Sequence, residues 1–321
     1  MDPTLSAGLR RRLRRPTDAL PHARIGAVPI VWNNVDLADL RQGATGVEIL
    51  DEITRLGYEG TQLGLGFPEG QALHEALRVR HLSLAEVYYS IPPTPDGPAP
   101  GAHEIARQRL RLLHHGGGEV LCVAFDVASP RLETAGRATL PDTPRLTDEG
   151  WQRLTEHLHA VARDALAAGH RAAFHPHAGT YVETPDEIAR LARSTDPELA
   201  GICLDVGHCL VGGGDPVAQI RELGPRVTHV HLKDVDPDVL ARLRAGEIGG
   251  FDTAIRARLF TELGSGLLDL DGVLAVLIEL DYRGWLMVEQ DSAWGPPSES
   301  AAIGRRVLAA ALRRRAPARA A

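Results

Sequence analysis

The sequence has few of the features that mark membrane, disulfide-rich or nucleic-acid-binding proteins. Its 321 residues contain no run of about 18 consecutive apolar residues, which argues against a transmembrane helix. The three cysteines (Cys122, Cys203 and Cys209) are too few and too irregularly spaced for a disulfide framework or a paired-cysteine metal site. The net charge of −7 argues against a nucleic-acid groove. We therefore expect a cytoplasmic protein that binds neither membrane nor nucleic acid; a homo-oligomer stays open.

Lysine is the scarcest charged residue, because Lys233 is the single lysine among 35 basic residues. Arginine clusters instead at both ends of the chain, and no apolar segment of a secretory signal follows the first cluster. We expect residues 1–23 to form a basic N-terminal tail and residues 313–321 a C-terminal tail. Residues 24–312 lie between these tails and show no composition break, which indicates one domain.

Short apolar runs alternate with amphipathic segments throughout this domain. Eight runs are candidate strands: Ile25–Val31, Gly60–Leu65, Ser83–Tyr89, Val120–Phe125, Arg171–Phe174, Gly201–Leu204, Val227–Leu232 and Gly284–Val288. Helix starts are clear at Thr147, at the capping box Thr184–Glu187 and at Asp215-Pro216. Eight β/α units predict an α/β fold, a single (β/α)8 TIM barrel, in preference to a doubly wound sheet.

Four consecutive candidate strands finish with metal-ligand residue types. In a TIM barrel the carboxyl ends of the strands form the active-site mouth, and alternation along each strand decides which side chains face inward. We therefore expect His175, Asp205, His231 and Glu289 to lie around one cup-shaped depression at this mouth. Each alone reads as a loop residue or a hydrogen-bonded core group, but four in one cup favour a site for Mn²⁺, Co²⁺, Fe²⁺ or Zn²⁺.

Lys233 and His177 are the candidate acid and base beside these ligands, without an assignment of which is which. A cation held next to a metal should have a lowered pKa that suits proton transfer near neutral pH. The alternatives are that Lys233 only pairs with Asp234 or another carboxylate, and that His177 only orients His175.

Substrate contacts are expected from other strand ends. His208, three residues after the strand-end aspartate, suits a substrate hydroxyl, with a helix-capping histidine as the alternative. Trp32 and Asn33 follow the first strand and suit ring stacking and hydroxyl binding, or else a packed indole and a turn. Tyr88 and Tyr89 end the third strand, so that only one of them can face the lumen.

Several segments together resemble the xylose-isomerase-like barrels, and within them the inosose (2-keto-myo-inositol) dehydratases. The segments are HPHAGT at 175–180, DVGH at 205–208, HVHLKD at 229–234, GWLMVEQD at 284–291 and PIVWNN at 29–34. The resemblance spans nearly the whole barrel and is weakest between about residues 80 and 145. The sequence departs from these dehydratases at Gly264-Ser265-Gly266, where Gly-Asp-Gly is usual, and at Tyr88-Tyr89, where Trp-Tyr is usual.

The resemblance implies a divalent metal, usually Mn²⁺ or Co²⁺, held by His175, Asp205, His231 and Glu289. The wider family usually has glutamate at the position of His175, whereas the dehydratases have histidine. His208 matches the substrate-binding histidine of the family. The implied substrate is a carbohydrate or cyclitol, and the implied reaction is loss of water from a polyhydroxy cyclic ketone through an enediolate.

Three other functions stay open on the sequence. An isomerase or epimerase would use the same metal and enediolate and would differ in where the proton returns. A nuclease of the endonuclease-IV kind would need further Glu and His ligands and a basic groove, which the net charge of −7 opposes. A barrel that only binds a partner would have no reason to keep a metal-competent set of side chains.

Overall fold

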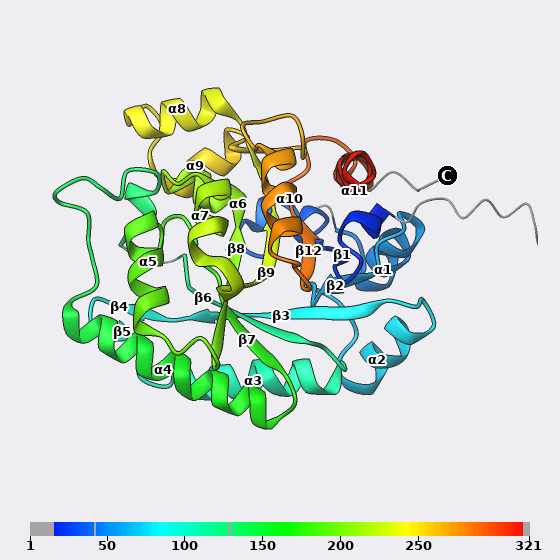
Figure 1. Ribbon diagram of the computed structural model, residues 1–321, viewed down its shortest axis with the longest axis horizontal. Coiled ribbons are helices and arrows are strands. Elements are labelled where there is room, and N and C mark those ends of the chain that lie inside the picture. The colour runs from blue at the N-terminus through cyan, green and yellow to red at the C-terminus, as the bar shows by residue number, and fades with distance from the viewer. Residues whose placement is uncertain (1–15, 42, 128–129, 317–321) are drawn as a thin grey trace, which may run out of the picture.

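The centre of the molecule is a closed barrel of eight parallel strands (Figure 1). The computed structural model describes residues 16–41, 43–127 and 130–316. The barrel strands are β1 (Arg24–Ala27), β2 (Gly60–Gln62), β3 (Ser83–Ile91), β6 (Val120–Phe125), β7 (Arg171–Phe174), β8 (Ala200–Asp205), β9 (Val227–Leu232) and β12 (Trp285–Val288). Strand β1 pairs with both β2 and β12 and so closes the sheet. The predicted TIM barrel is confirmed.

The first strand differs most from its prediction. A strand was expected over Ile25–Val31, but β1 ends at Ala27 and Pro29–Val31 forms the 3-10 helix η3. Proline fixes its own φ and has no N–H to give to a neighbouring strand, so the chain leaves the sheet here. The backbone N–H of Trp32 then bonds to the carbonyl of Pro29. This early turn decides where the following side chains lie.

Helices surround the barrel and connect its strands (Figure 1). They are α1 (Gly46–Arg55), α2 (Gly70–Arg78), α3 (Ala102–His115), α4 (Asp148–Ala167), α5 (Pro185–Ser194), α6 (Val206–Val211), α7 (Pro216–Leu223), α8 (Pro237–Ala245), α9 (Gly250–Arg256), α10 (Leu270–Glu279) and α11 (Pro297–Arg315). The predicted helix starts are confirmed, because Thr147 caps α4, Thr184 and Glu187 form a reciprocal capping box on α5, and Asp215 caps α7.

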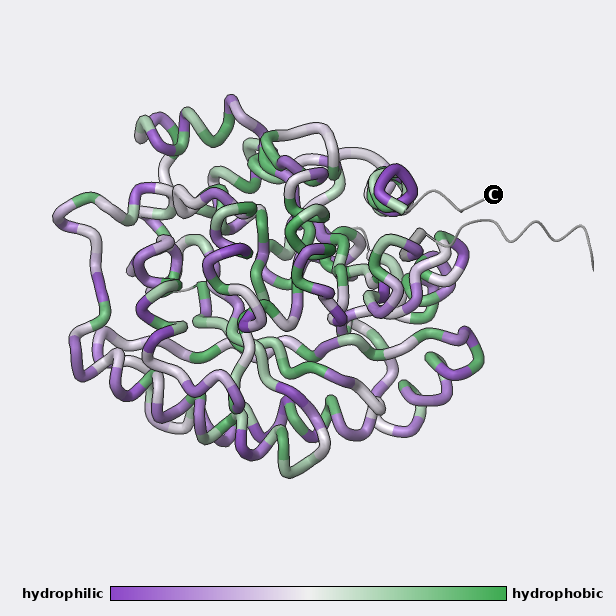
Figure 2. Tube along the Cα trace, in the orientation of Figure 1, coloured by the Kyte–Doolittle hydropathy of each residue, from purple (hydrophilic) through white to green (hydrophobic). Residues whose placement is uncertain are grey.

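The hydrophobic core lies between the barrel and the helices. Ile202 and Leu204 of β8 and Val230 and Leu232 of β9 belong to one large buried cluster on the outer side of the sheet. Figure 2 shows the same arrangement, with apolar colour along the central strands and mixed colours along the peripheral helices. The residues between these apolar positions point into the barrel, which is the inward alternation that the sequence predicts.

The first and last segments that the structure describes pack on the barrel. The 3-10 helix η2 (Pro16–Ala19) lies against α11, and Leu20 and Ala23 are buried, although both were assigned to a tail. Helix α11 continues to Arg315, beyond the boundary expected at residue 312. The arginine cluster of residues 10–15 lies outside the described residues. No helix in the described part of the chain is long and apolar enough to cross a membrane.

Candidate functional site

The four predicted metal ligands lie together at the carboxyl end of the barrel. One donor atom from each of His175, Asp205, His231 and Glu289 lies within 4.8 Å of every other. Nδ1 of His231 is 2.6 Å from a carboxylate oxygen of Glu289 and 3.9 Å from Oδ2 of Asp205. Nε2 of His175 is 3.7 Å from the same Asp205 oxygen. We call these four residues the cup.

The aspartate of the cup has one oxygen fixed by the fold and one turned into the site. Asp205 is the last residue of β8 and caps helix α6, because its Oδ1 accepts the backbone N–H of His208 at 2.8 Å. Its buried Oδ2 accepts no hydrogen bond within the described structure. A buried carboxylate oxygen without a donor is costly unless a cation compensates for it. Nζ of Lys233, 3.5 Å from this oxygen, compensates part of its charge. The mixed set of carboxylates and imidazoles in the cup also suits a divalent ion.

Both carboxylates of the cup are ionised. Burial by itself would raise the pKa of Asp205, but Lys233, His208 and His175 hold that pKa well below its usual range. Burial has the same effect on Glu289, whose pKa is nevertheless lowered by Lys233 and His231. Two ionised carboxylates with two imidazoles would balance the charge of one divalent ion.

Lys233 is buried among carboxylates rather than beside a single partner. Its Nζ lies 2.6 Å from Oδ1 of Asp291, 3.1 Å from Oε1 of Glu289 and 3.5 Å from Oδ2 of Asp205. Burial would lower the pKa of Lys233, but these carboxylates raise it well above its ordinary value. These carboxylates oppose the lowering of the lysine pKa that a neighbouring metal ion would cause, and they favour the ammonium form of Lys233.

The suggested pairing of Lys233 with Asp234 is wrong, and the pairing found is the other alternative, with a different carboxylate, Asp291. Asp234 turns away from the cup and accepts backbone N–H groups of Val235, Gly264, Gly266 and Leu268. It thus holds the Gly264–Gly266 turn against the small sheet of β10 (Asp234–Val235) and β11 (Phe260–Thr261).

His177 and His208 stack on each other beside the cup, with ring centroids 3.6 Å apart. Nδ1 of His177 bonds to the carbonyl of Ala178 at 2.8 Å, which assigns its proton to Nδ1 and leaves Nε2 as an acceptor. Burial, together with His175 and Lys233, lowers the pKa of His177 to about 3, so this imidazole is neutral. Nε2 of His208 lies 3.1 Å from Nζ of Lys233, which places it within the same polar group.

A cavity of about 80 Å³ opens above the cup. Its lining includes Asp36, Tyr88, His175, His177 and Lys233. A second cavity of about 410 Å³ shares Asp36, Tyr88 and three further residues with it. Together the two hollows offer room for a small polyhydroxy compound next to the cup.

The predicted substrate contacts divide between the cavity and the protein core. Tyr88 faces the cup, with its ring 5.7 Å from that of His175, whereas Tyr89 points outward and bonds to the carbonyl of Ala102. Trp32 and Asn33 do not line the cavity. The Trp32 indole packs toward α11 and donates to Ser298, and the Asn33 amide donates to Ala44. The physical reason is the early end of β1, which turns both side chains away.

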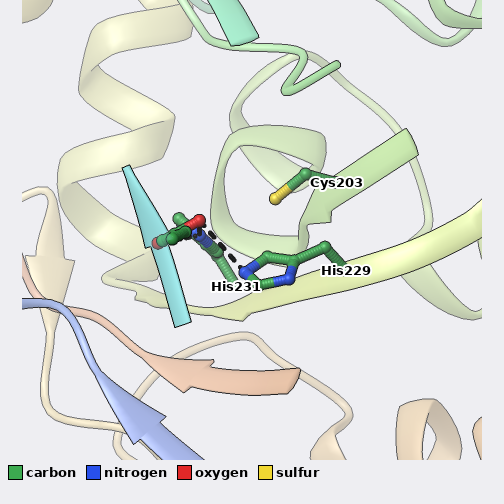
Figure 3. A group of neighbouring side chains, drawn as sticks. Cys203, His229 and His231 are labelled. Carbon is green, nitrogen blue, oxygen red and sulfur yellow. Dashed lines mark hydrogen bonds and ion pairs between the residues drawn. The ribbon is translucent and has the colours of Figure 1, made fainter. Parts of the chain in front are cut away.

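The sequence reasoning missed three buried polar residues. Asp291 is a partner of Lys233, and its spacing of two from Glu289 is a signal that could have found it. Glu86 lies inside the barrel below the cup, and it has the same strand parity as Tyr88. His229 is a buried residue of β9, and its Nε2 lies 3.0 Å from Oε2 of Glu86. Figure 3 shows His229 and His231 with Cys203 nearby.

Comparison with known proteins finds relatives in sequence and in fold. The inosose dehydratase of Geobacillus kaustophilus is 34% identical over 89% of this chain and 93% of that protein. Inosose dehydratase 1 of Bacillus cereus is 31% identical over 89% of this chain and 96% of that protein. The structure of an L-ribulose 3-epimerase superposes with a TM-score of 0.68 at 18% identity, covering 91% of this chain and 95% of that one.

The family model of the xylose isomerase-like TIM barrel matches residues 37–311, which include the barrel strands from β2 onward and all four residues of the cup. With the closed parallel barrel and the strand-end donors, this match places the chain in the xylose isomerase-like TIM barrel family.

Proposed function

We propose that the protein is a metal-dependent dehydratase that removes water from a polyhydroxy cyclic ketone such as 2-keto-myo-inositol. The observation that carries the proposal is the cup itself, in which two carboxylates and two imidazoles converge around an Asp205 oxygen that accepts no hydrogen bond. The identity of 31 to 34% with inosose dehydratases over most of their length supports the choice of substrate.

His175, Asp205, His231 and Glu289 are the residues that would hold the ion. A divalent ion such as Mn²⁺ or Co²⁺ bound there would act as a Lewis acid that polarises the ketone and makes the neighbouring C–H bond more acidic. The substrate ring would occupy the cavity above, where Tyr88 is in place to contact its hydroxyl groups. His208 does not line this cavity and packs behind it against the rings of His175 and His177.

The two proton-transfer roles follow from the charges of Lys233 and His177. A neutral imidazole with a free Nε2 can accept a proton, whereas an ammonium ion can only donate one. We therefore assign His177 as the base that takes the proton from the carbon next to the carbonyl. Lys233 gives a proton to the β-hydroxyl, which leaves as water while the C=C bond forms. The carboxylates around Nζ keep the ammonium in place.

The test is an assay of purified protein on 2-keto-myo-inositol, with the metal content of the same preparation measured by mass spectrometry. We expect close to one Mn²⁺ or Co²⁺ ion per chain and an ultraviolet-absorbing dione product. Chelator treatment should abolish the product, and added Mn²⁺ should restore it. Conversion to an isomeric inosose without ultraviolet absorption would replace the dehydratase by an isomerase or epimerase. Metal-loaded protein that leaves the inosose unchanged would exclude both activities on this substrate.

A further inference from the structure

A buried glutamate supports the cup from inside the barrel. Glu86 is on β3, across the lumen from β9, and is completely buried. Its two carboxylate oxygens lie 2.9 and 3.1 Å from Nε2 of His231. The mechanism proposed above does not use Glu86. Burying a carboxylate on the inner face of a barrel costs desolvation free energy, which the contacts of that carboxylate must offset.

The ring of His231 connects Glu86 with the cup. Its Nδ1 faces Glu289 and Asp205, and its Nε2 faces Glu86. Both nitrogens thus face carboxylates, and Glu289 is the nearer of them at 2.6 Å from Nδ1. An ion bound in the cup would take the lone pair of Nδ1, and Glu86 would then accept the N–H that remains on Nε2. Histidine ligands of metals commonly donate their other N–H to a carboxylate, which fixes the ring and makes the ligand more basic.

We infer that Glu86 is a positioning residue, which acts through His231 to present Nδ1 to a metal ion in the cup. The inference rests on the proposed metal-dependent function. It adds that the affinity of the cup depends on a side chain that does not itself reach the ion.

The other histidine of the cup, His175, has no carboxylate behind its ring in the part of the chain that the structure describes. Nδ1 of His175 has no hydrogen-bond partner among the described residues, so no carboxylate holds that ring from behind. The two imidazoles of the cup are therefore supported unequally, and the effect of Glu86 should pass through His231 alone.

The test is a titration of metal-stripped protein with Co²⁺ in competition with a chromophoric chelator. Glu86→Gln keeps the size of the side chain but removes its charge, and Glu86→Ala removes both charge and acceptor. We expect Co²⁺ affinity to fall about 10- to 100-fold in Glu86→Gln and at least as far in Glu86→Ala. The visible spectrum of the bound Co²⁺ should change as well, since it reports ligand orientation, which a loss of stability alone would not alter.

Tyr89→Phe is the matched control. Tyr89 is on the same strand and buried, but it faces outward and its hydroxyl contacts Ala102 and His157. This variant should keep the wild-type Co²⁺ affinity and spectrum, while the unfolding temperature of each metal-free variant shows whether the barrel is intact.

A measurement on the unaltered protein makes the test independent of how the variants fold. In Zn²⁺-loaded protein labelled with ¹⁵N-histidine, His231 should carry its proton on Nε2 and bind the ion through Nδ1. Binding through Nε2 would overturn the inference.

The remaining outcomes separate the inference from the proposed function. Wild-type Co²⁺ affinity in both Glu86 variants would overturn the positioning role and leave the metal site standing. Wild-type protein that binds no Co²⁺ would overturn the proposed function and the inference with it.

Cys203, His229, His231 and Glu86 also have donor atoms within 4.8 Å of one another. Two Co²⁺ ions per chain, with a near-ultraviolet thiolate-to-cobalt band that Cys203→Ser abolishes, would make Glu86 a ligand of a second ion and overturn its positioning role.

Discussion

The strands of the barrel have a hollow near each of their two ends, and the two hollows differ in size and in chemistry. At their amino ends lies a cavity of about 420 Å³ that includes Arg171, Thr228 and Arg283, all of which are exposed. At their carboxyl ends lies the cavity above the cup, of about 80 Å³, with buried His175 and Lys233. The larger hollow contains solvated charges, which cost little. The smaller one contains buried charges. Burial of charges destabilises a fold unless they are paired, so such a cluster indicates a functional site.

The largest effect should come from removing the Asp205 charge. Asp205→Asn keeps an oxygen to cap α6 but leaves a neutral amide in the cup. Loss of a ligand charge should cost more than the 10- to 100-fold typical of residues behind a ligand, so we expect little bound metal and turnover near zero. Asp215→Asn is the control, because Asp215 caps α7 in the same way at an exposed position. Full metal occupancy in Asp205→Asn would contradict the site.

The next effect concerns Lys233. Lys233→Arg keeps the positive charge among the carboxylates but cannot give up a proton at working pH. If Lys233 donates the proton to the leaving hydroxyl, turnover should fall about 10²- to 10⁴-fold with metal content and circular dichroism unchanged. Turnover close to that of the parent would reduce Lys233 to a structural cation that holds Asp291 and Glu289 in place.

Adding a negative charge to the cup should slow turnover less than the Asp205 and Lys233 substitutions do. With His175→Glu, the ligand set and a divalent ion together would carry a charge of −1 instead of zero. One extra charge at about 4 Å is worth up to about 4 kcal/mol at an effective dielectric constant near 20, before relaxation. It should oppose the negative charge that develops on the substrate. We expect metal content to stay at least equal and dehydration to slow, measured on the same preparation. A glutamate variant as fast as the parent would show that imidazole does not tune the site.

A pair of aromatic substitutions compares the cavity with the core. Tyr88→Phe removes a hydroxyl that faces the cavity, and KM should rise up to about tenfold, the worth of one hydrogen bond. Trp32→Phe removes a donor to Ser298 outside the cavity and should cost about 1 kcal/mol of stability with KM unchanged. Steady-state kinetics and thermal unfolding of both variants measure the contrast. An equal rise in KM for Trp32→Phe would indicate that Trp32 contacts the substrate after all.

The smallest effect is expected at the amino end of the strands. Arg283→Ala removes an exposed ion pair with Asp281 at the rim of the larger cavity. Exposed pairs contribute little because water screens them, so metal content, kinetics and the unfolding temperature should all match those of the parent. A clear loss of turnover would mean that the larger hollow takes part in function.

The agreement between sequence and structure is good wherever the signal is local. The helix starts at Thr147, Thr184 and Asp215 depend on side chains that bond to a backbone N–H a few residues away. The donors at the ends of four strands could be predicted because the strands are parallel and their side chains alternate. Both rules act over a few residues, and the sequence contains all the information that they need.

The sequence by itself thus determined the barrel, the starts of three of its helices and the convergence of His175, Asp205, His231 and Glu289 at one end. Only the tertiary structure decided which partners surround each of these groups. Glu86 meets His231 because β3 and β9 face each other across a closed and tilted barrel, a contact that joins positions 145 residues apart. The charge of Lys233 likewise depends on three carboxylates from two other strand ends, which raise a pKa that burial alone would have lowered. Electrostatic energies depend on distances through space, and those distances exist only after the barrel has closed.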